Sequence, residues 1–179
     1  MTIIARSLFV AFFAIASGNA LAQDVSQSPS APGNWIVTET TSPVDYTPVV
    51  VAVTRSRDSV ESSAMELTIS CRNGRTNLVL TGQTISGRGD DYAISYRIND
   101  DKPVQVGAAS PSFGTGAAFQ GDIVRLLRSF PDQGEIAIRL APRIGSASEG
   151  YFSLSGLRSV RDKLAAACKW PQAITKPRS

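Results

Sequence analysis

Hydrophobic and polar residues alternate along several short segments of the first half of the chain, with the period of two that half-buried β-strands show. The clearest case is residues 64–72, where Met65, Leu67, Ile69 and Cys71 alternate with polar or charged residues. Because successive side chains of a strand point to opposite faces, these four side chains share one face. The pattern predicts a strand that directs Cys71 into the core.

A strong turn signal follows this strand. The pair Asn73 and Gly74 is favoured in two-residue hairpin turns, because both positions must accept positive φ, and residues 76–80 are expected to return as the partner strand. The same reasoning predicts further strands at residues 35–38, 49–55, 92–99, 103–106, 135–140 and 151–154. The meander pairs leave no room for crossover helices, so their sheet is expected to be antiparallel.

Helical periodicity appears only in the second half of the chain. A first helix is predicted from the N-cap Asp122 to Phe130, since its apolar residues fall at helical spacing and Pro131 stops it. A second helix is predicted after a turn at Gly156. Its buried stripe consists of Leu157, Val160, Leu164 and Cys168, and Arg158 and Asp162 are spaced to pair on its outer face.

The N-terminal residues predict export. Residues 1–6 form a short basic region, residues 7–18 an apolar run, and residues 20–22 a small-x-small cleavage signature. We therefore expect a signal peptide at residues 1–22 and a periplasmic protein, with secretion beyond the periplasm as the alternative. Residues 23–33 are expected to be a flexible tether, residues 34–171 a single domain, and residues 172–179 a disordered tail.

Export changes the interpretation of the cysteines. Cys71 and Cys168 are the only two in the chain, and an oxidising compartment favours their pairing. The helical stripe would place Cys168 against the sheet that carries Cys71. The expected fold is α+β: a mostly antiparallel β-sheet or sandwich with two helices in the C-terminal half and one disulfide.

Charge and hydropathy exclude two classes of partner. Removal of residues 1–22 takes away only Arg6, so a net charge of +2 remains, and the basic residues are scattered. No nucleic-acid partner is therefore expected. Apart from the signal peptide no apolar run approaches the roughly 20 residues that span a bilayer, so no transmembrane segment is expected.

The chain contains no histidine, which excludes Ser-His-Asp and Cys-His catalysis. If the cysteines are oxidised, thiol catalysis and zinc binding through sulfur are also excluded. The remaining candidates are the carboxylates Asp90, Asp91, Asp100 and Asp101, which could form an acid/base pair or a calcium site. Their Gly and Asn neighbours favour turns instead. We expect no enzyme activity, no cofactor, no metal and no catalytic residue.

Three other features have both a functional and a structural interpretation. The tripeptide at residues 88–90 matches an integrin adhesion motif and is interpreted as a chance match in a glycine-rich loop. Arg97 is expected on the solvated face of its strand, paired with Asp100 or Asp101. Five aromatic residues would form either a ligand cluster or, as we expect, part of the core: Trp35, Tyr92, Tyr96, Phe152 and Trp170.

Several segments together resemble one protein family. They are Trp35 with Ser42-Pro43-Val44-Asp45, the strand ending at Cys71, the segment at residues 96–100, the helix at residues 122–130, and the C-terminal segment from Phe152 to Trp170. In these segments the chain resembles the VasI/TagO family of type VI secretion-associated periplasmic proteins. Tyr46 stands where the family pattern has a second acidic residue, and residues 104–106 lack an expected tryptophan. The resemblance implies an exported accessory protein without established catalysis.

Three functional hypotheses follow. The first is a non-enzymatic exported envelope accessory or protein-binding module, with an envelope or secretion-system protein as its partner. The second is an inhibitor of a cell-wall hydrolase such as lysozyme, acting through the loop at residues 82–91. The third is a hydrolase that uses the carboxylates named above.

Overall fold

The fold was examined in a computed structural model, which describes residues 34–57, 64–82, 85 and 88–171. The signal peptide, tether and tail predicted from the sequence lie outside these residues. A six-stranded sheet has the order β1 (Ile36–Thr41), β2 (Pro48–Arg55), β3 (Met65–Arg72), β4 (Arg75–Gly82), β8 (Ala117–Phe119) and β7 (Ala108–Ala109). A four-stranded sheet has the order β10 (Ser148–Ser153), β9 (Glu135–Pro142), β5 (Tyr92–Ile98) and β6 (Val104–Val106).

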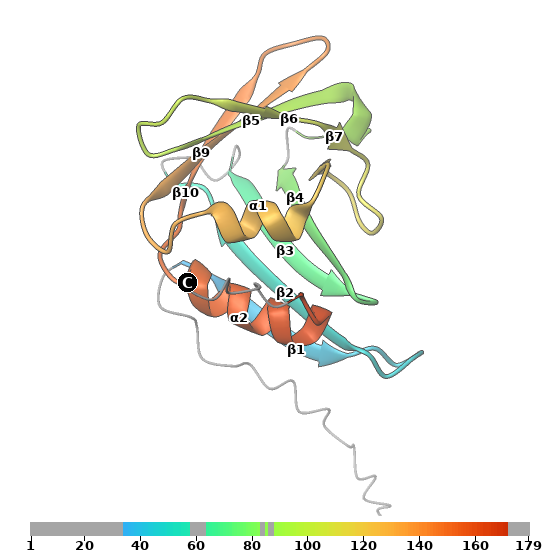
Figure 1. Cartoon of the computed structure of the whole chain (residues 1–179). Coiled ribbons are helices and arrows are strands. Elements are labelled where there is room, and N and C mark those ends of the chain that lie inside the picture. Colours follow the sequence, from blue (N-terminus) through green and yellow to red (C-terminus); the bar gives the residue numbers. More distant parts are fainter. Residues whose placement is uncertain (1–33, 58–63, 83–84, 86–87, 172–179) are drawn as a thin grey trace, which may run out of the picture.

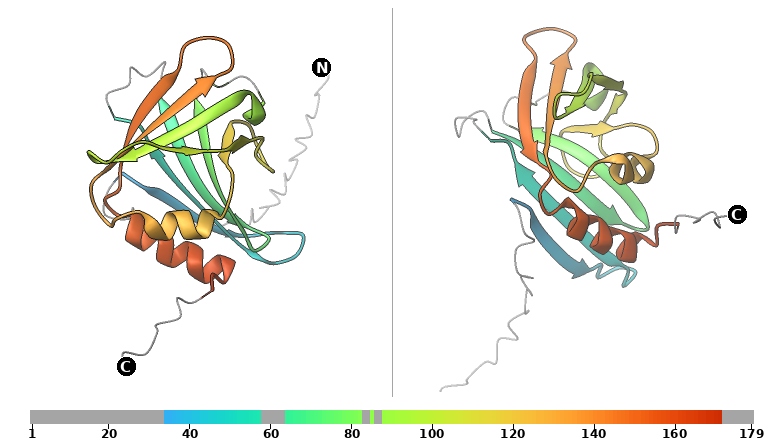
Figure 2. Two further views of the ribbon diagram at one scale, coloured as in Figure 1. Left: turned by 45° about the horizontal axis from the view of Figure 1, so that its top comes forward. Right: turned by 60° about the vertical axis from the view of Figure 1, so that its left-hand side comes forward.

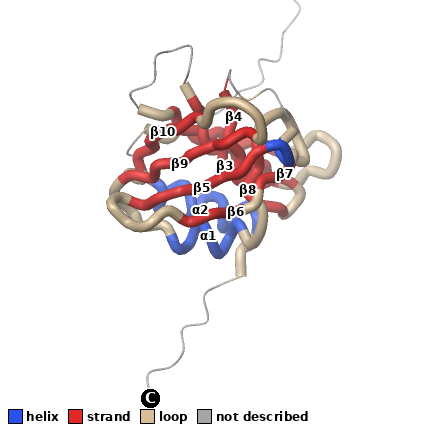
Figure 3. The backbone as a smooth tube through the Cα atoms, turned by 90° about the horizontal axis from the view of Figure 1, so that it is seen from above, coloured by secondary structure: helices blue, strands red, loops and turns tan. Residues whose placement is uncertain are grey.

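Two helices complete the fold: α1 (Ile123–Ser129) and α2 (Leu157–Cys168). Figures 1 and 2 show the four-stranded sheet and both helices on one face of the six-stranded sheet, and Figure 3 shows the helices beneath the smaller sheet when the molecule is seen from above. All strand pairs within the two sheets are antiparallel. The α+β class, the antiparallel sheets and the two late helices predicted from the sequence are thus confirmed.

One apolar cluster fills the space between these layers. It draws on alternate residues of β2, β3, β4 and β9 and on the stripe of α2. Trp35, Phe152 and Trp170 are buried in it, and Tyr92 and Tyr96 pack against its margin. The ring of Tyr96 meets the ring of Phe130 edge-on, with centroids 5.6 Å apart. The aromatic residues therefore belong to the core, as expected.

The hairpin and the disulfide also agree with the sequence predictions. Asn73 and Gly74 have φ values of 51° and 69° between β3 and β4, which is the geometry that the Asn-Gly pair favours. Cys71 and Cys168 form a disulfide across a Cα–Cα distance of 5.7 Å. Beyond it, the indole Nε1 of Trp170 donates a hydrogen bond of 2.7 Å to Thr76 Oγ1. The end of α2 is therefore fixed to the β3–β4 hairpin.

Two features of the structure differ from what the sequence predicted. Strands β7 and β8 were not predicted, because they have only two and three residues and show no alternation: all three residues of β8 are buried. Arg158 forms an ion pair with Asp132 at 3.4 Å and not with Asp162. Asp132 also binds Arg161. A carboxylate from another element thus replaces the partner that helical spacing suggested.

The N-cap of α1 gives a testable prediction. The carboxylate of Asp122 accepts a hydrogen bond of 2.9 Å from the backbone N–H of Arg125. Asp122→Ala should therefore lower the free energy of unfolding by about 1 kcal/mol, the usual value for a lost cap. Urea denaturation of the variant measures this loss. Asp122→Asn is the matched control and should unfold near the wild-type midpoint; equal losses in both variants would contradict the capping role.

No helix in the described part of the chain is long and apolar enough to cross a membrane.

Candidate functional site

The acidic residues singled out in the sequence do not converge. Asp90 and Asp91 lie at the start of β5, and Asp100 and Asp101 follow its end. The seven residues of β5 span roughly 23 Å at about 3.3 Å per residue, whereas paired catalytic carboxylates of glycosidases lie about 5–10 Å apart. Within the described residues no group of three or more His, Cys, Asp or Glu side chains is placed to hold a metal ion.

Asp90 and Asp91 instead stabilise a local turn, η2 (Gly89–Asp91). The Asp90 carboxylate accepts a hydrogen bond of 3.2 Å from the backbone N–H of Ser110. The Asp91 carboxylate accepts one of 3.3 Å from the backbone N–H of Arg88. A Cβ added to Gly89 would lie 1.8 Å from the carbonyl oxygen of Ala109. Residues 88–90 are therefore held against β7, and only glycine allows this close approach.

The loop proposed as an inhibitory segment is described only in part. Residues 83, 84, 86 and 87 lie outside the described residues. Ile85 is buried in the core, and its backbone N–H donates to the carbonyl of Gly82 at 3.1 Å. Of the described positions of this loop, Ile85 and Gly89 are buried, whereas Arg88, Asp90 and Asp91 are exposed.

Arg97 does not form the ion pair expected for it. Among the described residues no ion pair joins Arg97 to Asp100 or Asp101. The chain turns at Asn99, whose φ is 46°, and the Asn99 side-chain oxygen accepts a hydrogen bond of 2.9 Å from the N–H of Glu135. The turn that carries the two aspartates is therefore fixed to β9.

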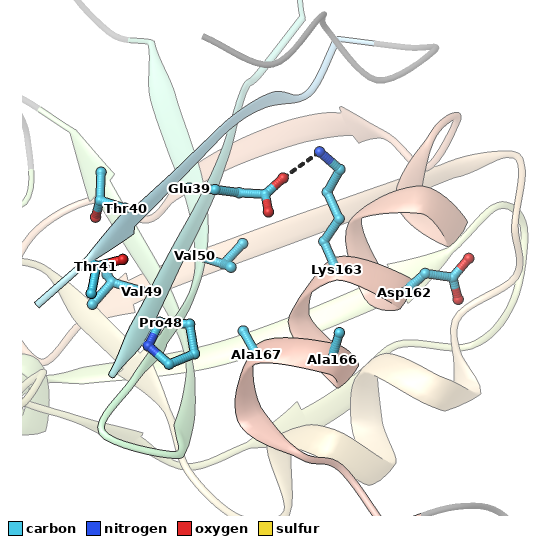
Figure 4. Close-up of a pocket in the computed structure, with 10 residues that line it drawn as sticks. All are labelled: Glu39, Thr40, Thr41, Pro48, Val49, Val50, Asp162, Lys163, Ala166 and Ala167. Carbon is cyan, nitrogen blue, oxygen red and sulfur yellow. Dashed lines mark hydrogen bonds and ion pairs between the residues drawn. The ribbon is translucent and has the colours of Figure 1, made fainter. Parts of the chain in front are cut away.

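A groove lies between the β1–β2 hairpin and α2, with a volume of about 640 Å³ (Figure 4). Val49, Val50 and Pro48 line its sheet side, and Ala166 and Ala167 line its helix side. An ion pair between Glu39 of β1 and Lys163 of α2 crosses it. We call this feature the α2 groove. It exists because α2 packs on β2 and β3, is bonded to β3 by the disulfide, and leaves most of β1 exposed.

The α2 groove continues into a second cleft at the end of the larger sheet. The two hollows share Thr40, Thr41 and Val49, and the second has a volume of about 310 Å³. Arg72 and Phe113 line this cleft and also a third hollow of about 330 Å³ beside Arg75 and Asn77. The β1–β2 turn, the β3–β4 turn and the segment before β8 therefore meet at this end of the sheet.

Large apolar side chains are exposed at this end. Val44 is 88% exposed, Tyr46 81% and Phe113 56%. The guanidinium of Arg72 lies over the ring of Phe113, 4.8 Å from its centroid. Val44, Tyr46, Arg72 and Phe113 are referred to below as the tip surface. Cation–π stacking of this kind holds an exposed aromatic ring in one place.

Internal hydrogen bonds hold the turn that carries Val44 and Tyr46. The Asp45 carboxylate accepts bonds from the Thr47 hydroxyl at 2.8 Å and the Thr47 N–H at 3.2 Å. Hydrogen bonds from the side chain of Ser42 and from Thr47 hold the pKa of Asp45 below its usual value. Tyr46 itself has a φ of 54°, a conformation that non-glycine residues seldom adopt and that clusters at functional sites.

The tip surface was not predicted from the sequence. Its residues come from three segments that are far apart in the chain, so no local pattern brings them together. The available signal was the presence of Val44, Tyr46 and Phe113 inside segments rich in proline, serine and glycine. In the structure these three side chains are exposed, and neighbouring exposed apolar side chains are typical of contact surfaces.

No family model, curated protein or solved structure matches the chain.

Proposed function

We propose that the protein is a non-enzymatic binding module of the bacterial cell envelope. In this proposal residues 1–22 direct export to the periplasm, and the partner is an envelope or secretion-system protein. The observation that carries the proposal is the tip surface, where three large apolar side chains are exposed beside connected clefts. The resemblance to the VasI/TagO family supports a partner associated with type VI secretion.

The composition of the tip surface suits protein recognition. Aromatic residues and arginine are enriched at protein interfaces and among the residues that contribute most binding energy. The hydrogen bonds around Asp45 and the stacking of Arg72 on Phe113 fix these side chains before binding. A fixed surface loses less conformational entropy when it is bound, which raises affinity. The disulfide supports an oxidising compartment such as the periplasm.

The geometry of the β1–β2 turn favours one alternative, inhibition of a cell-wall hydrolase. Tyr46 and Val44 are almost fully exposed on a tight turn, and a projecting turn can enter an enzyme cleft. This assigns the inhibitory role to residues 42–47 instead of residues 82–91. The rate of lysozyme, measured with increasing amounts of the protein, tests this alternative. An unchanged rate at a saturating amount of the protein would contradict inhibition. No observation favours the carboxylate hydrolase.

A double variant tests the binding proposal. Tyr46→Asn with Phe113→Ser removes two aromatic contacts, and asparagine accepts the positive φ at position 46. Chemical cross-linking in intact cells, followed by purification of the tagged full chain, should recover at least about tenfold less partner, since each such residue contributes about 2 kcal/mol or more. The measurement is quantitative mass spectrometry of the recovered proteins.

The matched control is Ile144→Ser. Ile144 is apolar and 93% exposed, and it belongs to the connection between β9 and β10, which lies at the top of Figure 1, away from the β1–β2 and β3–β4 turns. This variant should recover the same partner as the wild type. Equal recovery by the double variant and by Ile144→Ser would contradict the proposal.

A further inference from the structure

The sheet edges of this fold are unequal. An unpaired edge strand presents free backbone N–H and C=O groups that can template another strand. Strands β7 and β6 have two and three residues, and Pro103 precedes β6. Strand β10 is met by Arg57, whose N–H donates to the carbonyl of Tyr151 at 2.8 Å. Strands β1 and β10 are the six-residue edges, and among the described residues β1, at the end of the larger sheet, has no such bridge.

The register identifies which groups of β1 face outward. The N–H of Ser42 donates to the carbonyl of Thr47 at 2.9 Å, and hydrogen-bonded pairs alternate along an antiparallel ladder. Thr40, Thr38 and Ile36 therefore direct their backbone groups to β2. The N–H and C=O groups of Val37, Glu39 and Thr41 point to the open edge. Within the described residues these groups make no hydrogen bond.

The α2 groove lies beside this open edge. Glu39 and Thr41 line it together with Asp162, Lys163, Ala166 and Ala167 (Figure 4). Side chains alternate along a strand, so the residues whose backbone groups point outward also have their side chains on the α2 side. A strand added to β1 would place alternate side chains over the groove, between β1 and the small residues of α2. Main-chain bonds would supply affinity and the groove specificity.

A second copy of this chain is a poor occupant. The antiparallel register that pairs residues 37–41 of β1 with the same residues of a copy joins the outward-facing groups to one another and places Glu39 directly opposite Glu39. Like charges in that position are destabilising. The charged residues of the groove are Glu39, Asp162 and Lys163. Glu39 is paired with Lys163, so Asp162 leaves one negative charge in excess. A basic side chain opposite Glu39 would complement it, and apolar side chains on either side would meet Val37 and the alanines of α2.

We infer that β1 binds an extended segment of a partner protein as an added antiparallel strand, with a lysine or arginine opposite Glu39 and apolar residues two positions before and after it. This inference rests on the proposed binding function and specifies how the partner is held. The occupant is thus identified by backbone hydrogen bonding and by charge, and the tip surface would extend the same contact.

The test uses the full mature chain and the peptide Thr-Val-Thr-Lys-Thr-Val-Thr with blocked ends. In the free protein, amide hydrogen exchange measured by NMR should be at least about tenfold faster at Val37, Glu39 and Thr41 than at Thr38 and Thr40, because only the latter amides are bonded in the ladder. Addition of the peptide should slow exchange at the first three amides and leave the other two unchanged.

Two methylated peptides are the matched controls. Methylation of the Val and Lys nitrogens, which face β1 in the antiparallel register, should weaken binding at least about tenfold by removing up to three hydrogen bonds. Methylation of the Thr nitrogens at the third and fifth positions should leave binding within about threefold. Protein variant Glu39→Lys should weaken binding of the lysine peptide and strengthen that of a peptide with glutamate at the same position.

Four results would overturn the inference: no binding of the unmodified peptide at millimolar concentration, binding without protection of the three amides, equal effects of both methylation patterns, or protection that grows with protein concentration alone. The last result would indicate self-pairing. If the inference fails while the double variant at the tip surface still loses its partner in cells, the binding function stands and only the strand-addition mode is wrong. If the inference fails and the double variant also recovers as much partner as the wild type, the proposed binding function is wrong as well.

Discussion

Replacing Cys71 and Cys168 together by alanine is expected to lower the free energy of unfolding by about 2–5 kcal/mol. The disulfide joins residues 97 positions apart, and the loop-closure model assigns about 4.7 kcal/mol to a loop near 100 residues. Both half-cystines are buried, so the loss also affects the contact between α2 and β3. The free energy of unfolding of a whole domain is typically about 5–15 kcal/mol, so the disulfide accounts for a large part of it.

Urea denaturation of the two proteins, purified under oxidising conditions, measures this loss. Wild-type protein unfolded in the presence of a reductant is the matched control and should give a midpoint close to that of the double variant. A change below about 0.5 kcal/mol, the range of ordinary surface substitutions, would contradict the structural role assigned to the disulfide.

Phe152→Ala is expected to cost about 3–5 kcal/mol, the range for removal of a buried phenylalanine ring. Phe152 of β10 has no exposed surface. Gly150 lies against both the Phe152 ring and the sulfur of Met65: a Cβ built on it would be 3.1 and 3.2 Å from these atoms. The ring therefore fills space between the two sheets, and its removal would leave a cavity there.

The matched control for this variant is Phe113→Ala, which removes a ring that is more than half exposed. It should change the free energy of unfolding by no more than about 1 kcal/mol, since it loses one exposed cation–π contact and little buried area. Thermal or urea unfolding of the two variants gives the comparison. Similar losses at positions 152 and 113 would show that the core assignment is wrong.

Elements with strong periodicity could be predicted from the sequence. The alternation that ends at Cys71, the Asn-Gly turn and the stripe of α2 each rest on local physics, and the hairpin, the helix and the disulfide agree with them. The short strands β7 and β8 could not be predicted. Their few residues carry no period, and the pairing of β8 with β4 and of β7 with β8, rather than local propensity, determines them.

The candidate site was less predictable than the fold. The α2 groove arises because α2 is fixed to β3 at Cys71 and stops short of β1, a relation between distant residues. The tip surface combines Val44 and Tyr46 of the β1–β2 turn, Arg72 at the end of β3 and Phe113 of the β7–β8 connection. The outward backbone groups of β1 depend on its place at the end of the sheet order, which no local pattern gives. Asp90 and Asp91 form an acidic pair that is visible in the sequence, but their carboxylates stabilise a turn.

Photo-cross-linking in intact cells tests the central claim, that the tip surface contacts a protein partner, most directly. A photoreactive phenylalanine analogue is placed at Tyr46 in one variant and at Ile144 in another, since both side chains are large, apolar and mostly exposed. We expect position 46 to give one defined cross-linked species that excess unlabelled wild-type protein competes away, and position 144 to give none. Cross-linking at position 144 alone, or at neither position in cells that express the chain natively, would contradict the claim.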